Sequence, residues 1–115
     1  MQSKSESRIQ QEIYTWYWNT HCLPAHDPRE IIYHIPNEGK DNAKLVSVGL
    51  YPGAADLVFS HRGQHYYCEV KEPEKGSQSP SQKKFEKHVK QCGYVYFIIY
   101  SLDDFKQFIK KITEI

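Results

Sequence analysis

The feature that most constrains the fold is a pair of apolar runs on either side of Arg62-Gly63. The runs, ADLVFS (55–60) and HYYCEVK (65–71), are rich in aromatic and β-branched residues, which fit the pleated surface of a sheet. A glycine between two such runs is typical of a tight hairpin turn. The sequence therefore predicts two antiparallel strands, 55–60 and 65–71, that fold back on each other at Arg62-Gly63.

This hairpin brings three ionisable side chains together. Asp56 and Glu69 lie equally far from the turn, so they are expected to face each other across the two strands. Lys71 is two residues beyond Glu69 and therefore projects from the same face. Carboxylate oxygens suit a hard divalent cation, and an ammonium group suits the negative charge that develops on a phosphate. The cluster predicts metal-assisted hydrolysis of a phosphodiester.

Each member of the cluster also has a structural interpretation. Asp56 could cap the turn at the start of its strand, and Glu69 could simply pair with Lys71. A carboxylate in an apolar strand is costly to bury without a partner, and a metal ion is one partner among these. The residues alone leave both interpretations open.

The rest of the chain predicts helices and strands in alternation. A helix is expected over 4–19, opened by a capping box of Ser3 and Glu6, and a strand over 31–35. A short helix over 40–48 would be closed by Gly49. A third helix would begin after Ser79, with Pro80 at its first position.

The last two elements are a strand over 94–100 and a helix opened by Ser101 and Asp104. The strand is apolar at every position, which predicts a central strand covered on both faces. The expected order is α-β-α-β-β-α-β-α. The fold class is then α/β, with a mixed sheet flanked by helices, and residues 1–115 are expected to form one domain.

Composition narrows the class of protein. A hydrophobic content of 39% and a charged content of 25% are those of a globular chain rather than a disordered one. The longest apolar run, 94–100, is far shorter than a membrane span, and no signal peptide is apparent at the N-terminus. Three separated cysteines fit no disulfide framework. We therefore expect an intracellular protein with no membrane partner, in the cytoplasm of a bacterial or phage-infected cell.

Four motifs carry a resemblance to a known family. They are IPNEGK (35–40), VGLYPGAADLVF (48–59), EVK (69–71) and SPSQ (79–82). An aspartate followed by E-x-K on the next strand resembles the PD-(D/E)xK nuclease superfamily. The four motifs together resemble its virus-type replication-repair nuclease branch, VRR-NUC, over roughly residues 3–110. Ala54-Ala55 stands where that family often has a proline before the aspartate.

The resemblance implies a restriction-endonuclease-like fold and a role for each site residue. Asp56, Glu69 and the backbone carbonyl of Val70 would bind Mg²⁺ or Mn²⁺, with Glu6 as a further ligand. Lys71 would orient the attacking water or offset charge in the transition state.

Two helical residues have competing roles. Helical periodicity places Glu6 in line with Ile13, facing the sheet, whereas the capping box with Ser3 would use Glu6 structurally. Gln82 faces inward with Phe85, and the resemblance places a glutamine here close to the catalytic centre. Reciprocal capping with Ser79 is the other role for Gln82, and both could hold.

Lysines around the site are candidate phosphate contacts. They are Lys40, Lys75, Lys83, Lys84 and Lys87. Contacts of this kind would be insensitive to sequence and sensitive to salt. A solvated helix face is the alternative interpretation of the lysines in the third helix.

The resemblance also implies a substrate and an assembly. Compact VRR-NUC proteins tend to be homodimers that cut branched DNA such as four-way (Holliday) junctions, a substrate of DNA repair. The expected function is thus a metal-dependent, structure-selective DNA endonuclease. The alternatives are a monomeric flap or nicking nuclease, an inactive nucleic-acid-binding module on the same fold, and an enzyme that acts on RNA.

Overall fold

The computed structural model describes residues 4–36, 46–74 and 77–114. Four strands form one sheet in the order β1-β2-β3-β4. The first three strands, β1 (Ile32–His34), β2 (Leu57–His61) and β3 (Gln64–Val70), are antiparallel neighbours. The last strand, β4 (Val95–Ile99), runs parallel to β3. The predicted mixed sheet is confirmed.

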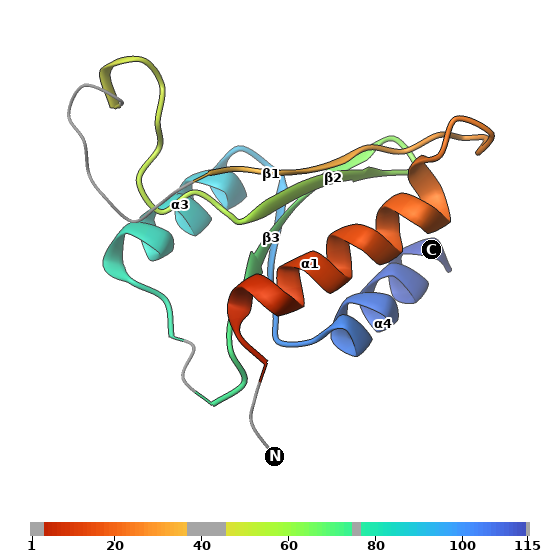
Figure 1. The fold of residues 1–115 in the computed structure, drawn as a ribbon. Helices are drawn as coiled ribbons and strands as arrows, with labels where there is room; N and C mark the ends of the chain where they lie inside the picture. Colours follow the sequence, from red (N-terminus) through yellow and green to blue (C-terminus); the bar gives the residue numbers. More distant parts are fainter. Residues whose placement is uncertain (1–3, 37–45, 75–76, 115) are drawn as a thin grey trace.

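Helices cover both faces of this sheet (Figure 1). On one face lie α1 (Glu6–Tyr17) and α4 (Leu102–Thr113), side by side. A π-helical turn, η1 (Trp18–Cys22), continues α1. The opposite face carries α3 (Pro80–Gln91). The α/β class and the flanking helices are therefore as expected.

The core is divided between the two faces. Ile9, Ile13 and Tyr17 recur at helical spacing on α1 and are buried against a cluster that includes Phe59 and Phe105. The cluster under α3 is smaller and contains Ala54, Ala55, Phe85, Val89 and Tyr96. Along β3, Tyr66, Cys68 and Val70 belong to the first cluster and Tyr67 packs against the second, as the alternation of side chains along a strand requires.

The hairpin has the predicted register. Leu57 faces Cys68 and Val58 faces Tyr67, so positions equally far from the turn lie opposite each other. Arg62 and Gly63 both have positive φ angles, 51° and 84°, as a type I′ hairpin turn requires. The strands span 57–61 and 64–70 rather than 55–60 and 65–71, because pairing continues up to the turn and stops short of Asp56.

The start of the first helix differs from the prediction. Its N-cap is Ser5, whose side chain accepts a hydrogen bond from the backbone N–H of Arg8 at 3.2 Å. Ser3 lies outside the described residues, and the predicted capping box with Glu6 is wrong. Either serine has the chemistry to cap a helix, so the local sequence could not choose between them. The α-helix also ends earlier than expected and passes into η1.

The position of β4 also differs from the prediction. Among the described strands β4 pairs only with β3, so it lies at an edge rather than in the centre. Its apolar pattern is nevertheless explained, because Phe97 and Ile99 pack toward α1 and α4 while Tyr96 and Ile98 pack toward α3. Burial of both faces determines that the strand is apolar at every position, whereas the number of neighbouring strands that it pairs with does not.

Two expectations concern other segments. Most of the short helix expected over 40–48 falls on residues 37–45, which lie outside the described residues. None of the helices in the described part of the chain is long and apolar enough to cross a membrane.

Candidate active site

Asp56 is fixed at the point where the hairpin strands stop pairing. It follows two buried alanines, Ala54 and Ala55, and directly precedes β2. Its Oδ2 accepts a hydrogen bond from the backbone N–H of Val70 at 2.7 Å. This side-chain hydrogen bond lies just past the last backbone pair of β2 and β3. It holds the Asp56 carboxylate beside the end of β3. The expected meeting of Asp56 with the E-x-K strand is therefore observed.

Glu69 is a completely buried carboxylate with an unused oxygen. Its residue is 0% exposed. Its Oε2 accepts from Gln82 Nε2 at 3.1 Å, whereas no donor in the described part of the chain lies within hydrogen-bond distance of its Oε1. Burial raises the pKa of the Glu69 carboxyl to about 9; the Asp56 charge and a side-chain hydrogen bond that the protonated acid makes with Asp56 add to the rise, and Lys71 opposes it. Buried polar atoms rarely lack partners in native proteins, so this oxygen marks a position where a cation fits.

Lys71 reaches the same centre through Gln82. Its side chain is nearly buried, at 7% exposure, and its Nζ donates to Gln82 Oε1 at 2.7 Å. Among the ion pairs of residues 4–36, 46–74 and 77–114, none joins Lys71 to Glu69. The interpretation of Glu69 and Lys71 as a simple salt bridge is therefore not supported.

Gln82 caps α3 and also faces inward, as predicted, whereas a catalytic role for it stays a prediction. The Ser79 side chain accepts from the Gln82 backbone N–H, and Gln82 Oε1 accepts from the Ser79 backbone N–H, which completes a capping box. The same side-chain amide faces inward to Lys71 and Glu69. One glutamine thus joins the start of α3 to two charged groups of the site.

Glu6 lies at the margin of this centre. Its side chain is exposed, so it is aligned with Ile13 but not buried like it. Partial desolvation raises the pKa of Glu6, Lys71 lowers it, and Asp56 and Glu72 raise it further. No three His, Cys, Asp or Glu side chains in the described segments are grouped closely enough to hold a metal ion by themselves. A role for Glu6 as a ligand stays a prediction.

The lysines of α3 are exposed. Lys83 and Lys87 border a shallow depression with Lys90, which pairs with Glu86 at 2.6 Å. Lys84 is exposed on the same helix, whereas Lys40 and Lys75 lie outside the described residues. Contact of any of these lysines with nucleic acid stays a prediction.

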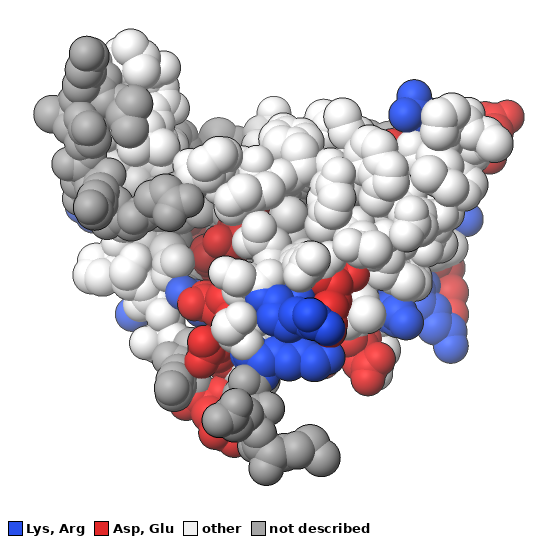
Figure 2. Space-filling view, viewed as in Figure 1, with Lys and Arg blue, Asp and Glu red and all other residues white. Residues whose placement is uncertain are grey.

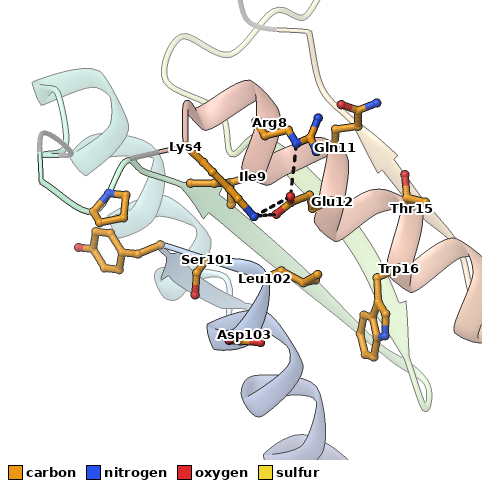
Figure 3. Close-up of a pocket in the computed structure, with 12 residues that line it drawn as sticks. Lys4, Arg8, Ile9, Gln11, Glu12, Thr15, Trp16, Ser101, Leu102 and Asp103 are labelled. Carbon is orange, nitrogen blue, oxygen red and sulfur yellow. Dashed lines mark hydrogen bonds and ion pairs between the residues drawn. The ribbon is translucent and has the colours of Figure 1, made fainter. Parts of the chain in front are cut away.

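A larger cleft lies elsewhere, between α1 and α4 (Figure 3). Its volume is about 660 Å³, and none of Asp56, Glu69 and Lys71 lines it. Lys4 and Arg8 converge there on Glu12, at 2.8 and 3.3 Å. Basic and acidic side chains are likewise interleaved over this part of the surface in Figure 2. Since its cations are already paired, the cleft gives no comparable indication of a ligand.

The donor set of the site fits a hard divalent cation. Two carboxylates on one face, one of them with an unpaired buried oxygen, offer the oxygen ligands that Mg²⁺ and Mn²⁺ prefer. A cation would also supply the charge that a buried carboxylate needs.

Comparison with known proteins identifies the architecture. A scan against family models gives no match, and neither does a search of curated proteins. A solved structure described as "VRR_NUC domain protein" superposes with a TM-score of 0.73 over 99% of this chain and 89% of its own, at 21% identity. The chain has the fold of VRR_NUC domains. A second structure, described as "VRR_NUC domain", covers 96% of this chain and 97% of its own, with a TM-score of 0.59 and 21% identity. The fold expected from the VRR-NUC resemblance is thus confirmed.

Sequence analysis missed two contributors to the site. Glu72 follows the E-x-K motif directly and is close enough to influence Glu6, so its position was a usable signal. Gly53 acts through a close approach to Ser81 and Gln82, which are distant from it in sequence. No local pattern predicts that approach.

Proposed function

We propose that this protein is a metal-dependent nuclease of the VRR-NUC family that hydrolyses phosphodiester bonds in branched DNA. The observation that carries the proposal is the unpaired, fully buried Oε1 of Glu69 beside Asp56 and Lys71. A structural ion pair would have used that oxygen, whereas a catalytic cation site keeps it available. The fold shared with VRR_NUC domains supports the same conclusion.

Asp56, Glu69 and the Val70 carbonyl are the groups proposed to hold Mg²⁺ or Mn²⁺. When bound, such an ion polarises a phosphate oxygen and makes a water molecule more acidic. The chain keeps its own ligands in place beforehand, because the Val70 N–H orients the Asp56 carboxylate and Gln82 orients Glu69. Orientation before binding reduces the reorganisation needed during the reaction.

Lys71 is the proposed cationic group of the chemical step. Its ammonium is held by Gln82 Oε1 in a nearly buried position, where a charge acts more strongly than in water. There it would stabilise negative charge that develops on the scissile phosphate, or orient the attacking water.

The preferred DNA and the assembly belong to the same proposal. We propose a homodimer acting on four-way junctions, because two sites related by a twofold axis suit a symmetric substrate. Lys83, Lys84 and Lys87 would contact phosphates on either side of the scissile bond, with Lys40 and Lys75 as further contacts.

A cleavage assay tests the proposal. The parent protein is incubated with a four-way junction, a flap and a linear duplex, in Mg²⁺, in Mn²⁺ and in chelator, with RNA versions in parallel. We expect junction cleavage with either metal and none in chelator. The Asp56→Asn variant should lose at least about 100-fold in rate, while still binding the junction.

Asp103→Asn is the matched control. Asp103 is exposed in the first turn of α4, so the same chemical change there should leave the rate within about twofold. If Asp56→Asn cuts as fast as Asp103→Asn in Mg²⁺, the proposed roles are wrong. Size-exclusion chromatography with light scattering tests the homodimer separately.

A further inference from the structure

The turn before Asp56 touches the backbone of the first turn of α3. A Cβ built on Gly53 would lie 2.3 Å from the carbonyl carbon of Ser81, 2.5 Å from its oxygen and 2.6 Å from the backbone nitrogen of Gln82. Real Cβ contacts are not this short, and backbone atoms cannot move aside cheaply. Gly53 also has a φ of +80°, which favours glycine. Only glycine therefore allows α3 to start where it does.

The start of α3 in turn fixes the orientation of the Gln82 amide. Gln82 Oε1 accepts two hydrogen bonds, from the Ser79 backbone N–H at 2.9 Å and from Lys71 Nζ at 2.7 Å. A flipped amide would direct its own N–H groups at both of these donors, which is unfavourable. Nε2 is consequently left to donate to Glu69 Oε2.

The bridging amide also separates the Lys71 ammonium from the Glu69 carboxyl group. Lys71 and Glu69 share the α3 face of β3, yet no ion pair of the described chain joins them. Gln82 contacts both instead. If Gln82 were displaced, the Lys71 ammonium could pair with the free oxygen of Glu69, whose pKa it already lowers. Such a pair would occupy the carboxylate that a cation needs.

We propose that the first turn of α3, docked on Gly53 and capped by Ser79, acts as a spacer that holds the Lys71 ammonium away from the Glu69 carboxylate. Gly53 and Ser79 are then positioning residues, which act through Gln82 and touch no reacting atom. This inference rests on the proposed function, since the spacer matters only if Glu69 must stay free for a cation.

The first test is Mn²⁺ binding, measured by calorimetry without substrate. Gln82→Ala should weaken Mn²⁺ binding by about tenfold or more, as loss of a group that orients a ligand does. Adding Lys71→Met to Gln82→Ala should restore the parent's affinity, because the competing ammonium is gone. Gln91→Ala, an exposed glutamine at the end of the same helix, should bind like the parent. Failure of the double variant to recover affinity overturns the spacer role.

The second test compares two glycines with nearly the same φ angle. Gly93 has a φ of +85° but nothing within 4 Å of an added Cβ. Gly53→Ala and Gly93→Ala therefore both place an alanine at a positive φ, and only Gly53→Ala displaces α3. We expect Gly53→Ala to need about tenfold more Mg²⁺ for half-maximal cleavage, and Gly93→Ala to need the parent's concentration. Equal Mg²⁺ requirements in the two variants would count against the inference.

Ser79 keeps the test informative if Gly53→Ala does not fold. Ser79→Ala should shift the Mg²⁺ requirement in the same direction as Gly53→Ala, and Ser79→Thr, which can still cap the helix, should restore it. A parent that neither binds Mn²⁺ nor cleaves DNA would overturn the proposed function and the spacer with it. A parent that does both, with Ser79→Ala and Gly53→Ala matching Gly93→Ala, would overturn the spacer alone.

Discussion

The two ends of the β2–β3 hairpin carry buried polar residues with opposite hydrogen-bonding states. At the turn end, His61 is 4% exposed, and both of its ring nitrogens have partners. Nδ1 lies 2.8 Å from the Tyr17 hydroxyl and Nε2 lies 2.8 Å from Thr113 Oγ1. At the open end, Glu69 is 0% exposed and one of its oxygens has no partner.

The turn end joins distant segments of the chain. Glu30 accepts from Ser60 Oγ at 2.8 Å and from the Arg62 backbone N–H at 2.9 Å. The Arg62 side chain donates to the Thr113 carbonyl at 2.8 Å. A network with paired members stabilises a fold, whereas an unpaired buried carboxylate costs stability and is retained where function requires it. One hairpin would then serve as a clamp at its turn end and as the proposed reactive centre at its open end.

The largest expected effect comes from exchanging a carboxyl for an amide at each end of the hairpin. We expect Glu69→Gln to lower the rate of DNA cleavage by about 10²–10³-fold, because an amide is a poor ligand for the proposed cation. Glu30→Gln should leave the rate within a few-fold at a temperature where both variants are folded. The measurement is the initial rate of DNA cleavage by each variant, with folding checked by circular dichroism. Equal losses in the two variants would mean that the two ends do not differ in function.

The free energy of unfolding, in contrast to the cleavage rate, should depend on the turn end of the hairpin. His61→Ala removes a buried ring and leaves the Tyr17 and Thr113 hydroxyls without one of their partners. We expect a loss of roughly 2–4 kcal/mol in the free energy of unfolding, measured by urea denaturation. His65→Ala, an exposed histidine on β3, should change it by less than about 0.5 kcal/mol. A His61→Ala variant as stable as His65→Ala would show that the network is not a clamp.

Glu69→Gln should make the metal-free protein more stable. Because its pKa is raised to about 9, Glu69 must take up a proton on folding near pH 7, which costs stability. An amide avoids that cost, so the free energy of unfolding should rise by about 1 kcal/mol. Urea denaturation in chelator measures the change. A loss of stability instead would indicate that the Glu69 carboxylate is a structural group.

Acid should lower the free energy of unfolding through protonation of His61 at the turn end. Burial lowers the pKa of His61, and His21 and Arg62 lower it further while Glu30 opposes them. The unfolded chain therefore takes up this proton first, at its ordinary pKa of about 6.5. Stability from this group is present above about pH 6.5 and is lost as pH falls toward the lower folded pKa, at no more than about 1.4 kcal/mol per pH unit. Comparing His61→Gln with the parent in urea at pH 7.5 and 5.5 should show a smaller acid-induced loss in the variant, and identical losses would contradict this assignment.

The two ends also differ in how far the sequence predicts them. Asp56, Glu69 and Lys71 could be placed together because the alternation of a strand and the turn at Arg62-Gly63 are local signals that fix a register. Gln82 was recognised for a similar reason, since a helix cap and an inward face are both local patterns.

The hydrogen-bond network at the turn end has no local sequence pattern that predicts it. Tyr17, His61 and Thr113 come from α1, β2 and α4, and each looks like an ordinary residue of its own element. The edge position of β4 and the contact of Gly53 with α3 were missed for the same reason. Local sequence patterns predict which face of each helix or strand is buried. Only the folded structure shows which residues from distant segments contact that face.

Direct binding of Mn²⁺, measured by loss of the free-ion signal in electron paramagnetic resonance, tests the central claim most directly. The parent and Asp103→Asn should bind the ion with the same affinity, and both Asp56→Asn and Glu69→Gln should bind it at least about tenfold more weakly. If Asp56→Asn and Glu69→Gln bind Mn²⁺ as tightly as the parent, the carboxylates at the open end of the hairpin do not form a cation site.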